Sequence, residues 1–269
     1  MAEKQRIDIE ITERGLAESR EKAKVFIMAG DVYVNNQKCD KPGTLVSKDD
    51  DIEVRAEKLP FVSRGGLKLD KAVHTFNIDL KDKICVDIGA STGGFTDCML
   101  QNGAAKVYAV DVGYGQLAWS LRTDERVVNI ERQNFRYITE EHIPEKLDFA
   151  SADVAFISLK KIIPPLLPLL KDDARGVFLI KPQFEAGKEN VGKNGVVRDA
   201  NVHFAVIKDI TDFLLDVGFS IIGLDYSPIT GPKGNIEYLV YVKFDKQGND
   251  EANVDIANLV ETSHSGLAK

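Results

Sequence analysis

A glycine-rich turn between an apolar segment and a helical pattern constrains the fold of this chain more than any other feature. The apolar run that begins at Ile84 ends at Asp87, a turn with three glycines follows, and a helical pattern continues with Met99 and Leu100 on its apolar side. Glycine is needed where the backbone must approach a ligand closely, and the start of a helix offers unpaired N–H groups to an anionic part of that ligand. Residues 84–95 therefore predict the first strand, turn and helix of a nucleotide-binding α/β sheet.

The spacing within this turn indicates which ligand to expect. It reads Asp-x-Gly-x-x-x-Gly-Gly, which differs from the Gly-x-Gly-x-x-Gly of nicotinamide-dependent enzymes. The difference favours S-adenosylmethionine over a dinucleotide, since the charged amino-acid end of this cofactor fits beside a strand-end carboxylate. A second predicted strand ends in Asp111, and an acid at that place in this sheet class hydrogen-bonds ribose hydroxyls. A glycine turn kept for packing is the alternative, and the pair of strand-end acids favours nucleoside binding.

S-adenosylmethionine is expected to lie along these two strand ends and the end of the third predicted strand. We expect the glycine turn at its methionine end, Asp111 at its ribose, and Asn134 with Phe135 at its adenine. The predicted cofactor-binding residues are Asp87, Gly89, Ser91, Gly93, Gly94, Phe95, Asp111, Asn134 and Phe135.

Length, charge and cysteine content limit the class of protein. The 269 residues leave room for one substantial domain and one small one. A net charge of −7 argues only weakly against a nucleic-acid partner, because affinity for phosphates depends on a local basic patch. The apolar stretch 162–170 is interrupted by three prolines and is too short to cross a bilayer, and no secretory core follows the amino terminus. We therefore expect a cytoplasmic protein with no membrane partner, no bound metal and reduced cysteines.

Segments of strand and helix type alternate from Pro60 to about residue 244. The predicted strands are residues 84–87, 107–111, 127–130, 149–157, 176–180, 220–226 and 237–244. The clearest helix is 199–217, which Asp199 can cap and Gly218 ends. Because the last two strands are consecutive, the pattern predicts an α/β, Rossmann-like class I methyltransferase sheet, mostly parallel with an antiparallel last strand. This domain is expected over 67–245, followed by a polar tail, 246–269, with at most a short helix at 254–259.

Residues 1–59 predict a small α+β unit of their own. Ser19 can cap a helix that Gly30 ends, and strands are expected at 31–36 and 52–54. Such a unit can bury only a modest core, which favours a binding module over a catalyst. Pro60 stops strand pairing, so residues 60–66 are predicted to form a linker.

The order of residues in this unit resembles the S4-like RNA-binding domain, named for the ribosomal protein in which it occurs. The matching positions are Arg6, Asp8, Arg14, Gly15, Leu16, Ser19, Arg20, Ala23, Ile27, Gly30, Val32, Val34, Asn35, Pro42 and Asp51. Arg14, Arg20 and Lys24 can place their charges along one face toward RNA phosphates. The alternative is a solvated charged face, which charge alone favours and the resemblance argues against. The predicted RNA-binding residues of the whole chain are Arg6, Arg14, Arg20, Lys24, Arg64, Lys188, Lys193 and Arg198.

Four polar residues fall where a parallel sheet places its active site, at or near the ends of predicted strands. They are Lys68, Asp153, Lys181 and Glu237. Lys68 also suits the exposed side of an amphipathic helix, and Glu237 also suits a plain strand-end acid. Asp153 and Lys181 lie in apolar segments, where a buried charge needs a partner. Together, two cations and two anions form a neutral set that can be desolvated.

Four segments make the resemblance to one family specific. They read Ser-Arg-Gly-Gly-x-Lys-Leu, Asp-x-Gly-x-x-x-Gly-Gly-Phe, Ile-Lys-Pro-Gln-Phe-Glu and Gly-Asn-x-Glu-Tyr, and over residues 3–244 the chain resembles the TlyA family, often labelled haemolysins. Its members join an S4-like domain to an FtsJ-type ribosomal RNA 2′-O-methyltransferase domain. The resemblance implies S-adenosylmethionine-dependent methylation of a cytidine ribose 2′-hydroxyl in ribosomal RNA, with a catalytic Lys-Asp-Lys-Glu tetrad at Lys68, Asp153, Lys181 and Glu237. Some members carry Arg-x-Trp-Val in the linker, where residues 59–62 of this chain read Leu-Pro-Phe-Val and lose the cation.

Lys181 is the hypothesised acceptor of the hydroxyl proton. A neighbouring lysine and desolvation favour its neutral form, while Asp153 and Glu237 limit that effect and orient the amine. The loop 187–195, which contains two lysines, either closes over RNA or is a plain surface loop.

The sequence has two alternative functional interpretations. The chain is alternatively an RNA-binding protein with an inactive methyltransferase domain, or a membrane-active haemolysin. The second would need an amphipathic or spanning segment, which the sequence lacks.

Overall fold

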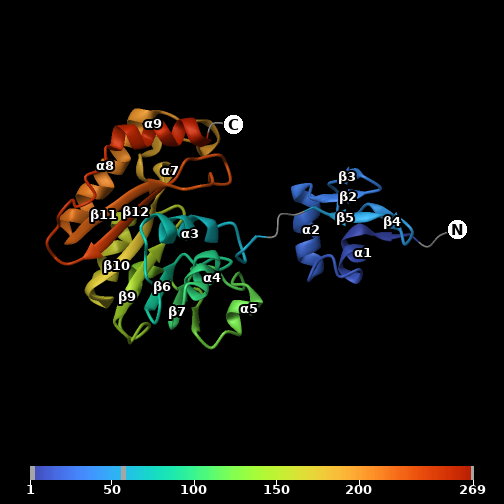
Figure 1. Ribbon diagram of the computed structural model, residues 1–269, viewed down its shortest axis with the longest axis horizontal. Helices are drawn as coiled ribbons and strands as arrows, with labels where there is room; N and C mark the ends of the chain where they lie inside the picture. The colour runs from blue at the N-terminus through green and yellow to red at the C-terminus, as the bar shows by residue number, and fades with distance from the viewer. Residues whose placement is uncertain (1–3, 56–58, 268–269) are drawn as a thin grey trace. The chain divides into compact units, whose positions relative to one another are not determined.

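The computed structural model describes residues 4–55 and 59–267. The chain divides into two compact units, Met1–Leu59 and Pro60–Lys269, and the first is drawn in blue in Figure 1. Each unit has a hydrophobic core of its own.

The first unit combines two helices with short antiparallel strands. Its elements are β1 (Lys4–Arg6), α1 (Ile7–Glu13), α2 (Arg20–Ala29), β2 (Val32–Val34), β3 (Gln37–Cys39), β4 (Leu45–Ser47) and β5 (Ile52–Val54). The predicted ends of α2 are confirmed, because Ser19 Oγ accepts the Lys22 N–H at 3.2 Å and Gly30 closes the helix with φ of 78°. Strands pair in the orders β3-β2-β5 and β1-β4.

The second unit is built on one sheet of seven strands in the order β11-β12-β10-β9-β6-β7-β8. These strands are β6 (Ile84–Ile88), β7 (Lys106–Val110), β8 (Val127–Ile130), β9 (Leu147–Ala152), β10 (Leu170–Ile180), β11 (Phe219–Tyr226) and β12 (Tyr238–Phe244). β12 runs antiparallel to both of its neighbours and the remaining pairs are parallel, so the predicted methyltransferase variant of the doubly wound sheet is confirmed. The chain order reverses between β6 and β9, where open α/β sheets bind their ligands.

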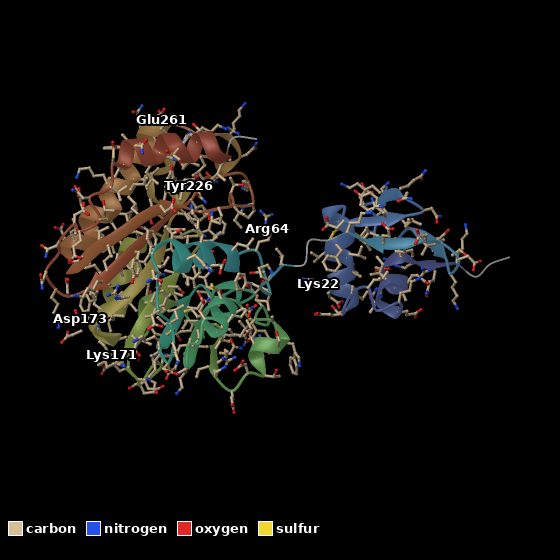
Figure 2. All side chains as sticks on the ribbon, viewed as in Figure 1. Lys22, Arg64, Lys171, Asp173, Tyr226 and Glu261 are labelled. Atoms are coloured by element: carbon tan, nitrogen blue, oxygen red, sulfur yellow. The ribbon has the colours of Figure 1, made fainter. Side chains whose placement is uncertain are left out.

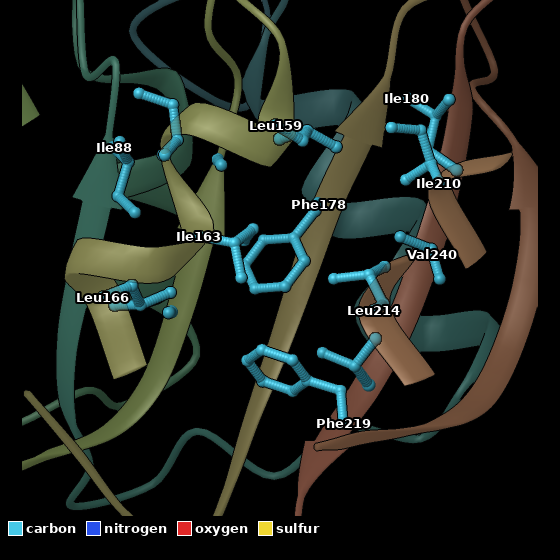
Figure 3. Close-up of a cluster of buried hydrophobic side chains, with 14 of the residues drawn as sticks. Ile88, Leu159, Ile163, Leu166, Phe178, Ile180, Ile210, Leu214, Phe219 and Val240 are labelled. Carbon is cyan, nitrogen blue, oxygen red and sulfur yellow. The ribbon is translucent and has the colours of Figure 1, made fainter. Parts of the chain in front are cut away.

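Helices cover both faces of this sheet (Figure 1). They are α3 (Gly66–Thr75), α4 (Gly94–Gln101), α5 (Trp119–Arg122), α6 (Ile163–Leu166), α7 (Pro182–Glu185), α8 (Ala200–Asp216) and α9 (Ile256–Leu267), with short 3₁₀ turns η1 (Phe135–Tyr137), η2 (Leu159–Lys161), η3 (Leu167–Leu169), η4 (Lys188–Asn190) and η5 (Lys193–Gly195). Side chains of a strand alternate between faces, so Val177 and Leu179 of β10 join the core under α3 and α4, while Phe178 joins the opposite one. Figure 3 shows Phe178 among Ile163 of α6 and Leu214 of α8.

The predicted long helix is confirmed as α8, because Asp199 Oδ1 accepts the Asn201 N–H at 2.8 Å and caps its start. Gly218 follows its end with φ of 93°. No described helix is long and apolar enough to cross a membrane.

Four boundaries differ from the sequence prediction by several residues. β10 begins at Leu170 and not at 176, because Leu170 pairs with Leu147 of β9 and Ala174 pairs with Phe244 of β12. β9 ends at Ala152 and not at 157, because the Asp153 side chain turns to two lysines and Phe156 has a φ of 62°, which breaks a strand. The expected polar tail contains the twelve-residue helix α9, since Leu259 and Val260 supply a buried apolar stripe against α8. Residues 60–66, expected as a linker, pack on the second unit through Phe61, which is 8% exposed.

Candidate active site

The structure brings the four predicted catalytic residues into one cluster, here called the tetrad: Lys68, Asp153, Lys181 and Glu237. Lys68 comes from the first turn of α3, Asp153 and Lys181 follow β9 and β10, and Glu237 precedes β12. Because β12 is antiparallel, its start lies at the edge where β9 and β10 end. The tetrad therefore assembles at the carboxyl edge of the parallel strands, the usual place for an active site in such sheets.

Contacts within the tetrad alternate in charge. Nζ of Lys68 donates to Glu237 Oε2 at 2.7 Å and to Asp153 Oδ2 at 3.1 Å. The ammonium of Lys181 pairs with the other oxygen, Oδ1, of Asp153. Lys68, Lys181 and Glu237 are 7%, 9% and 1% exposed, so Lys68 does not lie on the exposed side of its helix, and Glu237 is a buried partner of Lys68.

Burial and pairing act in opposite directions on these groups. Burial by itself would lower the pKa of Lys68, but the Asp153 and Glu237 carboxylates raise the pKa above its ordinary value. Burial would likewise raise the pKa of Asp153, but the Lys181 and Lys68 ammonium groups hold the pKa below its ordinary value. Lys68 is therefore a fixed cation between two anions, whereas within the described residues Lys181 has one carboxylate partner.

The glycine turn approaches the tetrad closely. Gly89 has a φ of 85°, and a Cβ at this position would lie 2.7 Å from the carbonyl oxygen of Asp153. Gly93, with φ of 99°, precedes α4, and a Cβ there would lie 2.3 Å from Leu121 Cδ1. Only glycine satisfies both conditions, so the turn can lie against the segment that carries Asp153.

Asp87 lies beneath the turn and not in contact with solvent. Its Oδ2 accepts hydrogen bonds from the Thr96 backbone N–H at 2.9 Å and from the Thr96 hydroxyl at 2.7 Å. Complete burial raises the pKa of Asp87 to about 7, although the Thr96 hydrogen bonds oppose this shift. Asp87 thus holds the first turn of α4 in place.

The second strand-end acid connects β7 to the glycine turn. Oδ2 of Asp111 accepts the Ser91 N–H at 2.8 Å, and Oδ1 accepts the Gly113 N–H at 2.6 Å. Val112, the next residue, is 69% exposed. A half-buried carboxylate beside an exposed apolar side chain suits a ribose and the adenine attached to it.

Three further predicted cofactor residues have structural contacts. Phe95 and Phe135 are 3% and 4% exposed and belong to the two cores on either side of the sheet. The Asn134 side chain caps η1 by accepting the Arg136 N–H at 3.1 Å. Asn134 therefore fixes the chain after β8, while Phe95 and Phe135 support the turn and the loop from below.

Exposed aromatic residues at this edge were not predicted as site residues from the sequence. Phe156 after β9 is 90% exposed, and Tyr114, Trp119 and Tyr137 in the segments after β7 and β8 are 68%, 77% and 66% exposed. The Phe156 ring lies 5.1 Å from that of Phe184, and Nζ of Lys181 lies 5.9 Å from the Phe184 ring. Large apolar side chains that stay exposed at the ligand-binding edge of a sheet are candidates for a binding surface. The only available signal in the sequence was an aromatic residue soon after each strand end.

The loop after α7 is anchored next to Glu237. Asn235 Oδ1 accepts the Val197 N–H at 3.0 Å, and its amide donates to the Gly195 carbonyl at 2.9 Å. Nε2 of His203 lies 3.1 Å from the Val197 carbonyl oxygen, and Nδ1 of His203 lies 2.7 Å from the Tyr238 hydroxyl oxygen. Lys188, Lys193 and Arg198 of this loop are exposed, as is Arg64 (Figure 2).

The predicted basic residues of the first unit have unequal environments. Arg14 donates to Glu10 at 2.7 Å and to backbone carbonyls of Asp50 and Lys48 at 2.8 and 2.9 Å, so its guanidinium ties α1 to the β4–β5 turn. Arg6 and Arg20 both contact Asp8 and stay 44% and 45% exposed. Lys24 is half-buried.

The strand order, the glycine turn and the buried tetrad define an α/β methyltransferase domain. In agreement, residues 61–244 match a family model described as FtsJ-like methyltransferase, and residues 5–52 match one described as S4 domain. The chain is 51% identical over 99% of its length, and 96% of the relative, to the Bacillus subtilis protein named "Putative rRNA methyltransferase YqxC". It is 43% identical over 90% of its length, and 91% of the relative, to "16S/23S rRNA (cytidine-2'-O)-methyltransferase TlyA" of Mycobacterium tuberculosis.

A solved structure shares both units. The structure titled "Putative hemolysin from Streptococcus thermophilus" is 46% identical, with a TM-score of 0.79 over 99% of this chain and 98% of that one. The chain belongs to the TlyA family of FtsJ-like methyltransferases.

The methyl donor of this family fits the residues at the β6 and β7 ends. S-adenosylmethionine is the cofactor of FtsJ-like methyltransferases. A Cβ at Gly89 would fill the cradle beside Asp153, and Ser91 has a φ of 48°, which turns the backbone around it. The Asp111 carboxylate is the chemical group that ribose hydroxyls require.

Proposed function

We propose that this chain methylates the 2′-hydroxyl of a cytidine ribose in ribosomal RNA. The observation that carries the proposal is the largely buried tetrad beside the glycine turn, in which, within the part of the chain that the structure describes, one lysine has two carboxylate partners and the other has one. The Mycobacterium tuberculosis relative that is named for this reaction supports the choice of substrate.

For this reaction the protein must supply a proton acceptor, and it need not activate the leaving group. When bound, S-adenosylmethionine supplies a methyl group on a sulfonium, which is already activated for transfer. The protein has to hold the ribose oxygen in line with that methyl group and take the hydroxyl proton. Nζ of Lys181 is the proposed acceptor, because among residues 4–55 and 59–267 it has a single carboxylate partner, while Lys68 is held as a cation by two.

Asp153 gives the proton transfer its direction. Its carboxylate contacts both lysines, so the ammonium that forms on Lys181 is stabilised where it arises. Glu237 balances the second cation, Lys68, so the cluster is neutral when Lys181 carries its proton. To accept the hydroxyl proton, Lys181 would first lose its ammonium proton to solvent and act as a neutral amine. The ribose oxygen would then take the methyl group, the sulfonium would be left as a thioether, and the hydroxyl proton would end on Lys181.

Aromatic residues and arginines supply contacts for an extruded nucleotide. Phe156 presents an exposed ring next to the Phe184 ring, which itself lies near Lys181, so Phe156 is the proposed stacking partner of the base whose ribose is methylated. Arg132 and Arg136 lie over the exposed rings of Tyr114 and Tyr137 at 4.1 and 5.4 Å. The S4 unit, with Arg6 and Arg20, is proposed to bind RNA phosphates.

The test is methyl transfer from labelled S-adenosylmethionine to ribosomal subunits that lack the modification, followed by mapping of the labelled nucleotide. Lys181→Ala is expected to abolish transfer while the affinity for S-adenosylmethionine, measured by calorimetry, stays nearly unchanged. Lys208→Ala, which removes an exposed lysine paired with Asp212 on α8, is the control and should be as active as wild type.

Two outcomes would contradict the proposal. Retained turnover in Lys181→Ala would remove this residue from the proton-transfer step. Wild-type protein that binds S-adenosylmethionine but labels no ribosomal RNA would favour the alternative of an RNA-binding protein without this activity.

A further inference from the structure

A buried carboxylate in the first unit holds two exposed arginines. Asp8, in the first turn of α1, is 0% exposed. Arg6 donates to it through Nε at 2.9 Å and through Nη2 at 3.1 Å, which is a two-point contact. Arg20, which starts α2, donates through Nε to the same carboxylate at 2.9 Å. Guanidinium groups from two different elements therefore meet at a single anion.

Both guanidinium groups keep donors available. Within the described residues, Nη1 of Arg6 and both Nη atoms of Arg20 make no hydrogen bond to the protein. Nη1 of Arg6 lies over Gly43, where a Cβ would be 3.3 Å away. One carboxylate facing two guanidinium groups also leaves a net positive charge at this place.

A second pair on the same helix behaves differently. Glu10 is 4% exposed and accepts from Arg14 at 2.7 Å. Arg14 is only 27% exposed, and its Nη1 and Nη2 both donate to backbone carbonyls between Ser47 and Asp50. The Glu10–Arg14 pair therefore holds the fold together and offers little to a ligand.

We propose that Asp8 is a positioning residue for RNA binding, which presets Arg6 and Arg20 as a pair of phosphate contacts. The inference rests on the proposed function and adds a residue that never touches RNA. An arginine loses side-chain freedom when it binds a phosphate, and a fork that is already fixed loses less. The Arg6 guanidinium, against the effect of burial, keeps the pKa of Asp8 at about 2, so the anion is present throughout the neutral range.

The substitution Asp8→Asn separates positioning from charge, because the two effects change RNA affinity in opposite directions. Asp8→Asn removes a negative charge beside two arginines, so an electrostatic effect without positioning would tighten RNA binding. Loss of positioning should weaken binding instead. We expect the dissociation constant of full-length Asp8→Asn for ribosomal RNA, measured by filter binding, to rise about 5- to 20-fold.

The matched control is Glu10→Gln, which also neutralises a buried carboxylate of α1. It should lower the midpoint of thermal unfolding but leave RNA affinity within about twofold of wild type, because Arg14 is committed to the protein. The slope of log affinity against log salt should become shallower by about 1 to 2 in Asp8→Asn and stay unchanged in Glu10→Gln.

Two further variants separate positioning from folding. In an Arg6→Gln/Arg20→Gln background, adding Asp8→Asn should change RNA affinity no further, since the residue acts through those arginines. Arg20→Lys keeps the charge and the buried anion but lacks the fork, and it should also bind RNA more weakly than wild type. This second variant tests the idea even if Asp8→Asn unfolds the unit.

The outcomes are distinguishable. If Asp8→Asn binds ribosomal RNA as tightly as wild type or more tightly, the positioning role of Asp8 is overturned. RNA affinity of Arg20→Lys equal to that of wild type would also overturn it. The proposed function would survive either result. Wild-type protein that does not bind ribosomal RNA would overturn the proposed function itself.

Discussion

At the scale of residues, the two lysines of the tetrad differ in what they neutralise. Lys68 lies between Asp153 and Glu237, so its removal leaves the buried Glu237 without any cation from the tetrad, while the half-buried Asp153 keeps Lys181. Lys181 pairs with Asp153, which would still have Lys68. Lys68 is therefore expected to serve stability as well as the reaction, and Lys181 mainly the reaction.

This difference gives a prediction for unfolding. Lys68→Ala should lower the free energy of unfolding by about 3–5 kcal/mol, because it leaves a buried charge uncompensated. Lys181→Ala should lower it by clearly less. Urea unfolding of both cofactor-free variants measures these free energies. Equal decreases would contradict the prediction, because the two lysines would then contribute equally to stability.

Asp87 gives a prediction for pH. Its pKa is raised to about 7 in the folded chain, so the folded state holds a proton that the unfolded state releases near pH 4. Stability from this group is therefore complete below pH 4 and is lost as the pH rises through 7. Asp87→Asn has no such carboxyl and should not show this loss. From pH 5 to pH 8, the free energy of unfolding of wild type should therefore fall by about 2–3 kcal/mol more than that of Asp87→Asn.

The measurement is urea unfolding of the cofactor-free protein at several pH values. The Asn side chain can still accept the two Thr96 hydrogen bonds, which makes the variant a fair comparison. Parallel stability curves for wild type and Asp87→Asn would contradict the prediction.

At the scale of elements, the segment after β9 carries a side chain that contributes little to the core. Phe156 has a φ of 62° and is 90% exposed. Both features cost free energy for a bulky residue, which suggests that this position serves function. Its contact with Phe184 joins this segment to α7, which follows Lys181. The two elements together present the proposed stacking surface.

Phe156→Ala should leave unfolding nearly unchanged and reduce kcat/KM for ribosomal subunits by about 10- to 100-fold, since one stacked base is lost. Phe204→Ala removes a 40% exposed ring of α8 and serves as the control. The readouts are labelled methyl transfer and thermal unfolding. A variant that methylates as well as wild type would exclude Phe156 from base binding.

At the scale of the whole molecule, the two units have separate cores and separate tasks in the proposed function. The tetrad, the glycine turn and Asp111 all belong to residues 60–269, while Arg6 and Arg20 belong to residues 1–59. Residues 60–66 pack on the second unit, so a cut before Pro60 removes none of its core.

A chain of residues 60–269 should therefore bind S-adenosylmethionine with the affinity of the full chain. Its methylation of ribosomal subunits should fall by about tenfold or more, because phosphate contacts are lost, and the deficit should grow with salt. Calorimetry and labelled methyl transfer check the two parts. Full activity of the shorter chain would show that the S4 unit is dispensable for the reaction.

The sequence by itself determined the features that depend on neighbouring residues. The glycine turn after β6, the Ser19 and Asp199 caps and the strand alternation of β10 follow from local spacing, because backbone geometry limits which residues suit each place. The four tetrad positions were also found, through the resemblance of their motifs.

Only the tertiary structure decided how these residues meet. Lys68 and Glu237 are 169 positions apart, so the unequal pairing of the two lysines depends on where α3 and β12 pack against the sheet. The same holds for the burial of Asp87, the exposure of Phe156, the docking of α9 and the convergence of Arg6 and Arg20 on Asp8. Such contacts join different elements of the fold, and burial and charge pairing arise only when those elements are packed together.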